Sequence, residues 1–194
     1  MIFIKTPQTM NYFLVFKSKL NYPLKFSLTN KTNGSWLAVG RFITELPAAP
    51  LVYEDAGNSK VSYEDLLSLD IIETVGGGVL FSERFKDLII VLAKNDVQVF
   101  PATFTYKGVN NTSYYVINIF NTVDCYDLNT SVYTKHPVDG SLKFSKATLK
   151  ITPLEEYGYE YHIVRSVEDN KIIVSDIFKQ QVEAAKINSV GFKK

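Results

Sequence analysis

The side chains in this sequence that could take part in catalysis or metal binding are few and scattered. There is one cysteine, Cys125, and there are two histidines, His136 and His162. Neither histidine is accompanied by a His, Cys or acidic spacing typical of a metal site. The chain contains no G-x-S-x-G, H-E-x-x-H or dinucleotide-binding motif. We therefore expect no catalytic residues, no metal and no cofactor, with Cys125 as a buried small hydrophobic residue and the histidines as surface or hydrogen-bonded side chains.

Two aspartates, Asp124 and Asp127, form a D-x-x-D pair that could hold a metal ion. They follow a predicted strand and precede Asn129 and Ser131. Aspartate and asparagine side chains accept hydrogen bonds from nearby backbone N–H groups and so stabilise tight turns. We interpret the pair as turn-forming residues, and metal binding is the alternative.

Three consecutive glycines, Gly76 to Gly78, suggest a phosphate-binding loop. The P-loop pattern requires a lysine and a serine or threonine after its last glycine, just inside a helix. Here a predicted strand, Val79 to Phe81, intervenes before any helix. We interpret the glycines as a flexible joint that precedes a core strand.

One stretch, Glu155 to Tyr161, combines acidic residues with three tyrosines around Gly158. Pro153 precedes it, as expected for a projecting hairpin. Tyrosine offers a large contact area at a small entropic cost, and carboxylates complement a basic partner. We predict that a protein partner is bound here by a set of four residues: Glu155, Glu156, Tyr157 and Tyr159. The alternative is a solvated hairpin whose tyrosines pack on their neighbours.

Two segments that must position these residues share one pattern. Ser82 and Ser175 each follow a short apolar run and precede an acid at +1 and a phenylalanine at +3. A serine at this place caps a helix, because its hydroxyl accepts a backbone N–H of the first turn, and the acid suits the positive end of the helix dipole. Each segment then continues to a second strand, at Val97 to Phe100 and at Val190 to Phe192. The pattern predicts two strand-helix-strand units.

The two predicted helices differ in their apolar faces. Phe85, Leu88, Ile89 and Leu92 follow the helical repeat, and neighbouring apolar residues including Val91 predict burial on more than one side. The second helix has a narrower stripe, formed by Phe178, Val182 and Ala185, and is expected to cover a sheet with its back in water.

The rest of the chain is rich in strand signals, which supports an α+β fold in which antiparallel strands join the two units. A helix capped by Ser62 is expected, and a hairpin turn over residues 107–111. We divide the chain into a β-rich N-terminal part, residues 1–75, and an α+β core, residues 76–194, that together form one compact unit. The further strands expected are Ile2–Ile4, Tyr12–Phe16, Leu24–Leu28, Trp36–Val39, Val97–Tyr106, Tyr114–Phe120, Leu142–Ile151, Tyr159–Val164 and Lys171–Val174.

Composition excludes several classes of protein. A chain of 194 residues with 46% hydrophobic and 21% charged residues can bury one substantial core. Its net charge of +1 gives no general attraction to nucleic acid or to a membrane surface. No apolar run reaches the ~20 residues of a membrane span, and the N-terminus lacks the features of a signal peptide. We expect a cytoplasmic protein that binds neither nucleic acid nor membrane.

An ordered series of short motifs resembles one bacterial family, the immunity proteins of polymorphic toxin systems that were long catalogued as a domain of unknown function. The resemblance covers residues 79–192, and Asn188 and Ser189 stand where the family usually has glycine after the last helix. We expect Asn188 to adopt the left-handed helix cap that asparagine tolerates. The motifs are Phe81–Phe85, Val99–Pro101, Tyr114–Asn118, Val123–Asp127 with Ser131, Ile173–Asp176 and Gly191–Phe192.

The resemblance implies a non-enzymatic protein whose partner is a cognate toxin domain made by the same cell, often one delivered by a secretion system. It brings no catalytic residues, and it implies that Asn118, Asp124, Asp127 and Ser131 define the fold. One alternative is an enzyme or small-molecule-binding protein with a pocket near Gly76–Gly78 or Asp124/Asp127. Another is a structural or adaptor component of a secretion apparatus.

Overall fold

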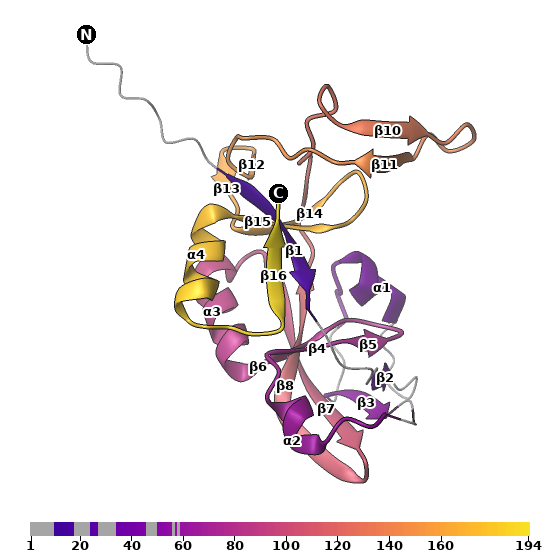
Figure 1. Cartoon of the computed structure of the whole chain (residues 1–194), viewed down its shortest axis with the longest axis vertical. Coiled ribbons are helices and arrows are strands. Elements are labelled where there is room, and N and C mark those ends of the chain that lie inside the picture. Colours follow the sequence, from indigo (N-terminus) through magenta and orange to yellow (C-terminus); the bar gives the residue numbers. More distant parts are fainter. Residues whose placement is uncertain (1–9, 18–23, 27–33, 46–49, 56, 58) are drawn as a thin grey trace.

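The computed structural model describes residues 10–17, 24–26, 34–45, 50–55, 57 and 59–194. The strand expected at Ile2–Ile4 lies outside these residues. Within them the fold is mixed α+β, with two large sheets and two separate two-stranded hairpins (Figure 1). The predicted fold class is therefore confirmed at this level.

The larger sheet has seven strands and forms the lower half of the molecule in Figure 1. Its long hairpin turns at Lys107 and Gly108, which both have positive φ, of 48° and 79°. This is the backbone that a two-residue hairpin turn requires, so the turn is tighter than the predicted one. In spatial order the strands are β4 (Ile71–Ile72), β6 (Leu80–Ser82), β8 (Val109–Ile119), β7 (Val97–Tyr106), β3 (Leu51–Asp55), β2 (Leu24–Phe26) and β5 (Thr74–Val75).

The second sheet has five strands, and two small hairpins lie near it at the upper end of the molecule (Figure 1). The sheet runs β16 (Val190–Lys193), β1 (Asn11–Phe16), β15 (Ile172–Ser175), β14 (Ile163–Ser166) and β9 (Thr122–Val123). The hairpins are β10 (Val132–Lys135) with β11 (Leu142–Lys146), and β12 (Glu155–Glu156) with β13 (Tyr159–Glu160).

The helix caps predicted from the serines are confirmed. Ser82 Oγ accepts from the Phe85 N–H at the start of α3 (Glu83–Ala93), and Ser175 Oγ accepts from the Phe178 N–H at the start of α4 (Asp176–Ala184). Ser62 likewise caps α2 (Tyr63–Leu67), where its hydroxyl accepts from the Asp65 N–H at 3.0 Å. These helix starts follow from local chemistry, so the sequence alone placed them.

Each predicted strand-helix-strand unit has a third strand inserted between its two strands. β8 lies between β6 and β7, and β1 lies between β15 and β16, antiparallel to both neighbours in each case. The two units belong to different sheets, and α3 and α4 lie side by side at the left of Figure 1. A buried apolar cluster from both helices and both sheets joins the units.

Several local predictions were wrong in detail. Residues 36–39 belong to a short helix, α1 (Gly34–Val39), rather than a strand, because Gly34 and Leu37 are buried at helical spacing. The strand expected at Leu142–Ile151 ends at Lys146, and the one expected at Tyr159–Val164 is interrupted after Glu160. Val91, at 83% exposed, faces away from the core, so α3 is not buried on that side, and Ala185 is exposed beyond the end of α4.

The expected left-handed cap at Asn188 is also absent, because the positive-φ residues after α4 are Lys186 and Ser189. Asn188 instead uses its side chain: Oδ1 accepts from the Asp70 N–H at 2.9 Å, and Nδ2 donates to the Ser68 carbonyl at 2.8 Å. Asparagine at this position therefore ties the α4–β16 connection to the segment before β4.

Strands from the first 75 residues contribute to both large sheets. β1 is an inner strand of the five-stranded sheet, and β3 pairs in parallel with β7 in the seven-stranded sheet. The division at residue 75, proposed from the sequence, remains a prediction.

Candidate functional site

The acidic, tyrosine-rich stretch forms a projecting hairpin. Glu155 pairs with Glu160 and Glu156 with Tyr159, while Tyr157 and Gly158 form the turn with φ of 52° and 77°. The Tyr157 side chain is 99% exposed. The hairpin predicted from Pro153 and Gly158 is therefore confirmed, and binding of a partner by Glu155, Glu156, Tyr157 and Tyr159 remains a prediction.

The base of this hairpin is anchored while its tip is free. Leu154 is buried beneath it, and its carbonyl accepts from the Tyr161 N–H at 2.6 Å. The rings of Tyr159 and Tyr161 pack edge to face with centroids 4.8 Å apart. Tyr159 also interacts with the Asp96 carboxyl in the α3–β7 connection and lowers its pKa. The hairpin thus presents Tyr157 from a supported base, which lowers the entropic cost of binding.

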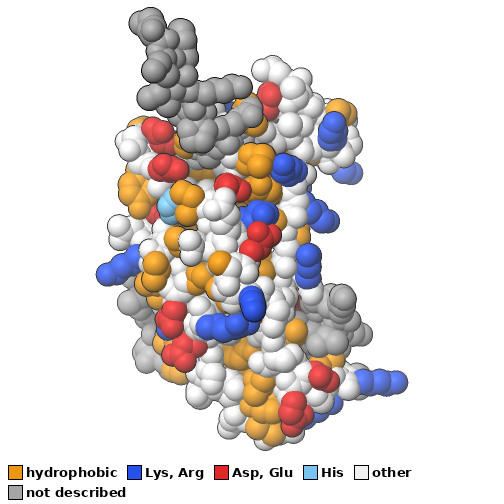
Figure 2. Space-filling model, turned by 60° about the vertical axis from the view of Figure 1, so that its left-hand side comes forward, with side chains coloured by type: hydrophobic (Ala, Val, Ile, Leu, Met, Phe, Trp, Pro, Cys, Tyr) orange, Lys and Arg blue, Asp and Glu red, His pale blue; other side chains and the backbone are white. Residues whose placement is uncertain are grey.

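Negative charge at this hairpin is not neutralised within the described part of the chain. Glu155, Glu156 and Glu160 are exposed, and no ion pair joins them to a described lysine or arginine. Figure 2 shows acidic side chains together with hydrophobic ones on the upper part of one face of the molecule. Such a surface can attract a basic partner and offer it an aromatic contact.

A second projection, the β10–β11 hairpin, was not singled out from the sequence. Val132 and Val138 are exposed on it, and Lys135, Lys143 and Lys146 give it positive charge. The four strand positions Val132 to Lys135 are all exposed. The lysines at 135, 143 and 146 were the feature of the sequence that could have indicated this basic hairpin. Its first strand has no buried face, so it lacks the alternation of apolar and polar residues by which a strand is recognised.

Asp127 acts as the predicted turn-forming residue, whereas Asp124, for which the same role was predicted, forms an ion pair at the surface. Asp127 Oδ1 accepts from the Asn129 N–H at 3.0 Å, and its Oδ2 accepts from the Thr130 hydroxyl at 2.8 Å. Asp124 pairs with Lys150 at 2.8 Å, and this contact lowers the pKa of the Asp124 carboxyl. Among the described residues, no group of three or more His, Cys, Asp or Glu is placed to hold a metal ion.

The cysteine and histidines occupy structural positions. Cys125 is buried, and burial raises the pKa of its thiol to about 12, so the reactive thiolate is suppressed at neutral pH. His162 Nδ1 lies 3.0 Å from Ser175 Oγ, the cap of α4, and His136 Nδ1 lies 3.0 Å from Asp139. The expectation of a buried small Cys125 is confirmed, and the structure gives both histidines a hydrogen-bonding partner.

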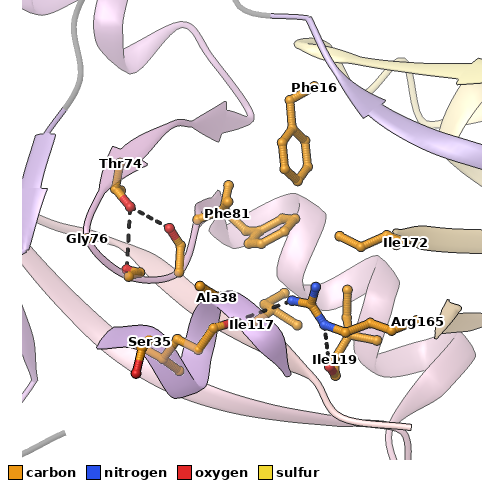
Figure 3. A pocket seen from close by; sticks show the side chains of 14 residues that line it. Phe16, Ser35, Ala38, Thr74, Gly76, Phe81, Ile117, Ile119, Arg165 and Ile172 are labelled. Carbon is orange, nitrogen blue, oxygen red and sulfur yellow. Dashed lines mark hydrogen bonds between the residues drawn. The ribbon is translucent and has the colours of Figure 1, made fainter. Parts of the chain in front are cut away.

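The Gly76–Gly78 segment forms one wall of a cavity of about 450 Å³ (Figure 3). Gly76 and Gly78 have φ of 95° and 73°, a region that favours glycine. Gly76 and Gly77 pack directly on the Gly34 backbone, so that a Cβ on Gly34 or on Gly77 would not fit. The Gly77 carbonyl accepts from the Tyr53 hydroxyl at 2.7 Å. The segment is therefore a joint before β6, as expected, but one held in place by its contacts.

Arg165 lies in the same cavity and was missed by sequence reasoning. It is 8% exposed in β14, where the surrounding residues Ile163, Val164 and Ser166 are also buried. Its guanidinium donates to three backbone carbonyls, those of Ile119 at 2.9 Å, Asn170 at 3.2 Å and Leu37 at 3.4 Å. The feature of the sequence that could have indicated this buried charge was an arginine inside an otherwise apolar predicted strand.

Within the described residues, no helix has the length and apolar character needed to cross a membrane. Comparison with protein families shows that the chain matches the immunity protein family Imm11 over residues 12–194. The matched region begins well before residue 79, where the resemblance noted in the sequence begins, and it includes the inner strand β1. No curated protein matches the chain.

Proposed function

The chain belongs to the Imm11 immunity protein family, and on that premise we propose that it binds a cognate bacterial toxin domain and neutralises it by stoichiometric protein–protein inhibition. In this proposal the protein acts in the cytoplasm of the cell that makes the toxin. It catalyses no reaction, and its function requires no metal, cofactor, nucleic acid or membrane.

The observation that carries the proposed mode of binding is the β12–β13 hairpin. Tyr157 stands free at its tip, and Glu155, Glu156 and Glu160 surround it with negative charge that no described lysine or arginine neutralises. A few aromatic and charged residues provide most of the binding energy of a typical protein interface. A toxin with basic residues around its active site would accept this hairpin, and the bound protein would then cover that site.

The experiment is co-expression with the product of the adjacent gene, as the candidate toxin. We expect the two proteins to purify together at a one-to-one ratio, and the toxin in that complex to be inactive in its own assay. Titration of purified protein into active toxin should abolish activity at one equivalent. A substoichiometric amount that inactivates the toxin would indicate catalysis instead, and an absence of binding would contradict the proposal.

A further inference from the structure

The structure contains a buried positive charge without a negative partner. None of the 20 Asp and Glu residues, all of which are described, forms an ion pair with Arg165. Burial lowers the pKa of Arg165 to about 10, so the guanidinium is still charged at neutral pH. An unpaired buried charge is costly, and buried charges in proteins are usually paired. The three carbonyl contacts orient this guanidinium but supply no countercharge.

Most of the side chains that line the cavity beside Arg165 are apolar, with Ser35 and Thr74 as the polar exceptions among the described residues. Among the described residues that line it, Arg165 is the one that carries a charge, and Phe81, Ile117, Ile119 and Ile172 form much of its wall (Figure 3). Its volume of about 450 Å³ falls within the range of small-molecule sites. A guanidinium has five N–H donors, of which three are used by the carbonyls, so donors remain for a ligand.

A second hollow adjoins the first and carries the same sign of charge. The two share Phe16, Arg165 and Ile172, and Lys171, Lys193 and Lys194 also line the second hollow, which has no acidic residue in its wall. The shared residues lie where β1 separates from β15, since the two strands pair only between Asn11–Phe13 and Ile173–Ser175. An apolar chamber therefore adjoins a basic hollow, with Arg165 lining both.

We propose that this double hollow binds an amphipathic carboxylate, with the carboxylate on Arg165 and an apolar chain in the chamber formed by Phe81, Ile117 and Ile119. A carboxylate matches the planar donors of arginine, and the apolar walls gain free energy from burial of an aliphatic chain. Lys193 and Lys194 add favourable charge in the second hollow. This site does not depend on toxin binding.

The direct test is isothermal titration calorimetry of the full chain, without toxin, against four probes: decanoate, decanol, acetate and decyltrimethylammonium. We expect decanoate to bind at one site, decanol to bind at least tenfold more weakly, a difference of about 1.4 kcal/mol, and the other two to show no binding at the same concentrations. Equal affinity for decanoate and decanol, or no binding of decanoate, would overturn the proposal.

Two neighbouring residues of α1 provide a matched pair of variants. Both side chains are exposed, but Ala38 lines the chamber and Val39 does not. Ala38→Trp should fill the chamber and weaken decanoate binding at least tenfold, while Val39→Trp should bind as the unchanged protein does. A folded Ala38→Trp protein with full affinity would contradict the site.

Arg165→Met tests the role of the charge. The variant should bind decanoate no better than decanol, because the aliphatic part of the side chain remains and the guanidinium does not. A folded variant that keeps the preference for decanoate would contradict the role of Arg165. If the variant does not fold, the comparison of Ala38→Trp with Val39→Trp still decides whether the site exists.

Discussion

The ring of Phe85 in α3 packs against the ring of Phe178 in α4, with centroids 6.4 Å apart and planes inclined by 46°. Both side chains are fully buried, and the backbone N–H of each residue donates to the serine that caps its own helix. The same position in each helix therefore fixes the helix start and joins the two strand-helix-strand units.

Substitution of either phenylalanine should strongly destabilise the protein. Phe85→Ala or Phe178→Ala removes a buried ring from the cluster shared by both sheets, and we expect the free energy of unfolding to fall by about 3–5 kcal/mol. Urea denaturation measures this change. Val91→Ala, on the exposed face of α3, is the control and should change stability by no more than about 0.5 kcal/mol. Unchanged stability in both phenylalanine variants would contradict the shared core.

Arg84 should matter more than an exposed ion-pairing lysine. Asp70 is 2% exposed, and its carboxylate accepts from Arg84 Nε at 2.7 Å and also from Arg84 Nη2. Arg84→Met leaves this buried carboxylate without its cation, so we expect a loss of about 1.5–3 kcal/mol in unfolding free energy. Lys150→Met, which breaks the exposed pair with Asp124, should cost less than about 1 kcal/mol. Equal losses for the two variants would show that burial of Asp70 is unimportant.

The interface prediction concerns the tip of the β12–β13 hairpin. Replacement of Glu155, Glu156 and Tyr157 together by alanine should weaken toxin binding at least tenfold, about 1.4 kcal/mol. The melting temperature should change little, because all three side chains are exposed. Surface plasmon resonance with the cognate toxin measures the affinity.

A matched control removes acidic charge elsewhere. Glu54 in β3 and Glu64 in α2 are exposed at the opposite end of the molecule (Figure 1). Replacement of both by alanine should preserve the affinity. Full affinity in a folded triple variant of the hairpin would place the interface on another surface.

Residues that resemble catalytic groups should be dispensable for protection. Asp124→Asn and His162→Gln preserve hydrogen-bonding capacity at positions where the structure shows an ion pair with Lys150 and a contact with Ser175. Cells that express either folded variant should survive the toxin as well as cells with the unchanged protein. A variant that binds toxin normally but fails to protect would favour an enzymatic mechanism.

Asp96 should make the protein less stable as pH rises, which is the opposite of the usual effect of an aspartate. Burial raises the pKa of its carboxyl, and His162, Tyr159 and Asn121 counter part of that rise. Because the folded-state pKa lies above the unfolded value of about 3.9, the folded state binds the proton more tightly. The contribution of Asp96 to stability should therefore fall as pH rises from about 4 through the folded-state pKa.

Asp96→Asn should remove this dependence, so the stability of the unchanged protein relative to the variant should decrease across that pH range in urea denaturation. Asp139 provides a control of opposite sign. Hydrogen bonds from Ser141 lower the pKa of Asp139, so its contribution is present above its unfolded pKa and lost as pH falls. If the stability difference from the unchanged protein varied with pH in the same direction for Asp96→Asn and Asp139→Asn, the opposite pKa shifts assigned to these two carboxyls would be contradicted.

Features that arise within a few residues were predictable from the sequence. The caps at Ser62, Ser82 and Ser175 depend on a hydroxyl and an N–H three residues apart. The turns at Gly108 and Gly158 depend on residues that tolerate positive φ. The Asp127 turn and the buried face of α4 likewise follow from short-range chemistry and periodicity, as did the α+β class.

The tertiary structure alone decided how distant segments meet. β8 is inserted between β6 and β7, and β1 between β15 and β16. Strands pair through backbone hydrogen bonds, which are the same for every residue type, so the sequence says little about which strands become neighbours. Arg165 bonds to Leu37, 128 positions away, and Asn188 to Asp70, 118 positions away. Such contacts form because packing of the core brings the segments together, so a chamber with one unpaired guanidinium exists only in the folded chain.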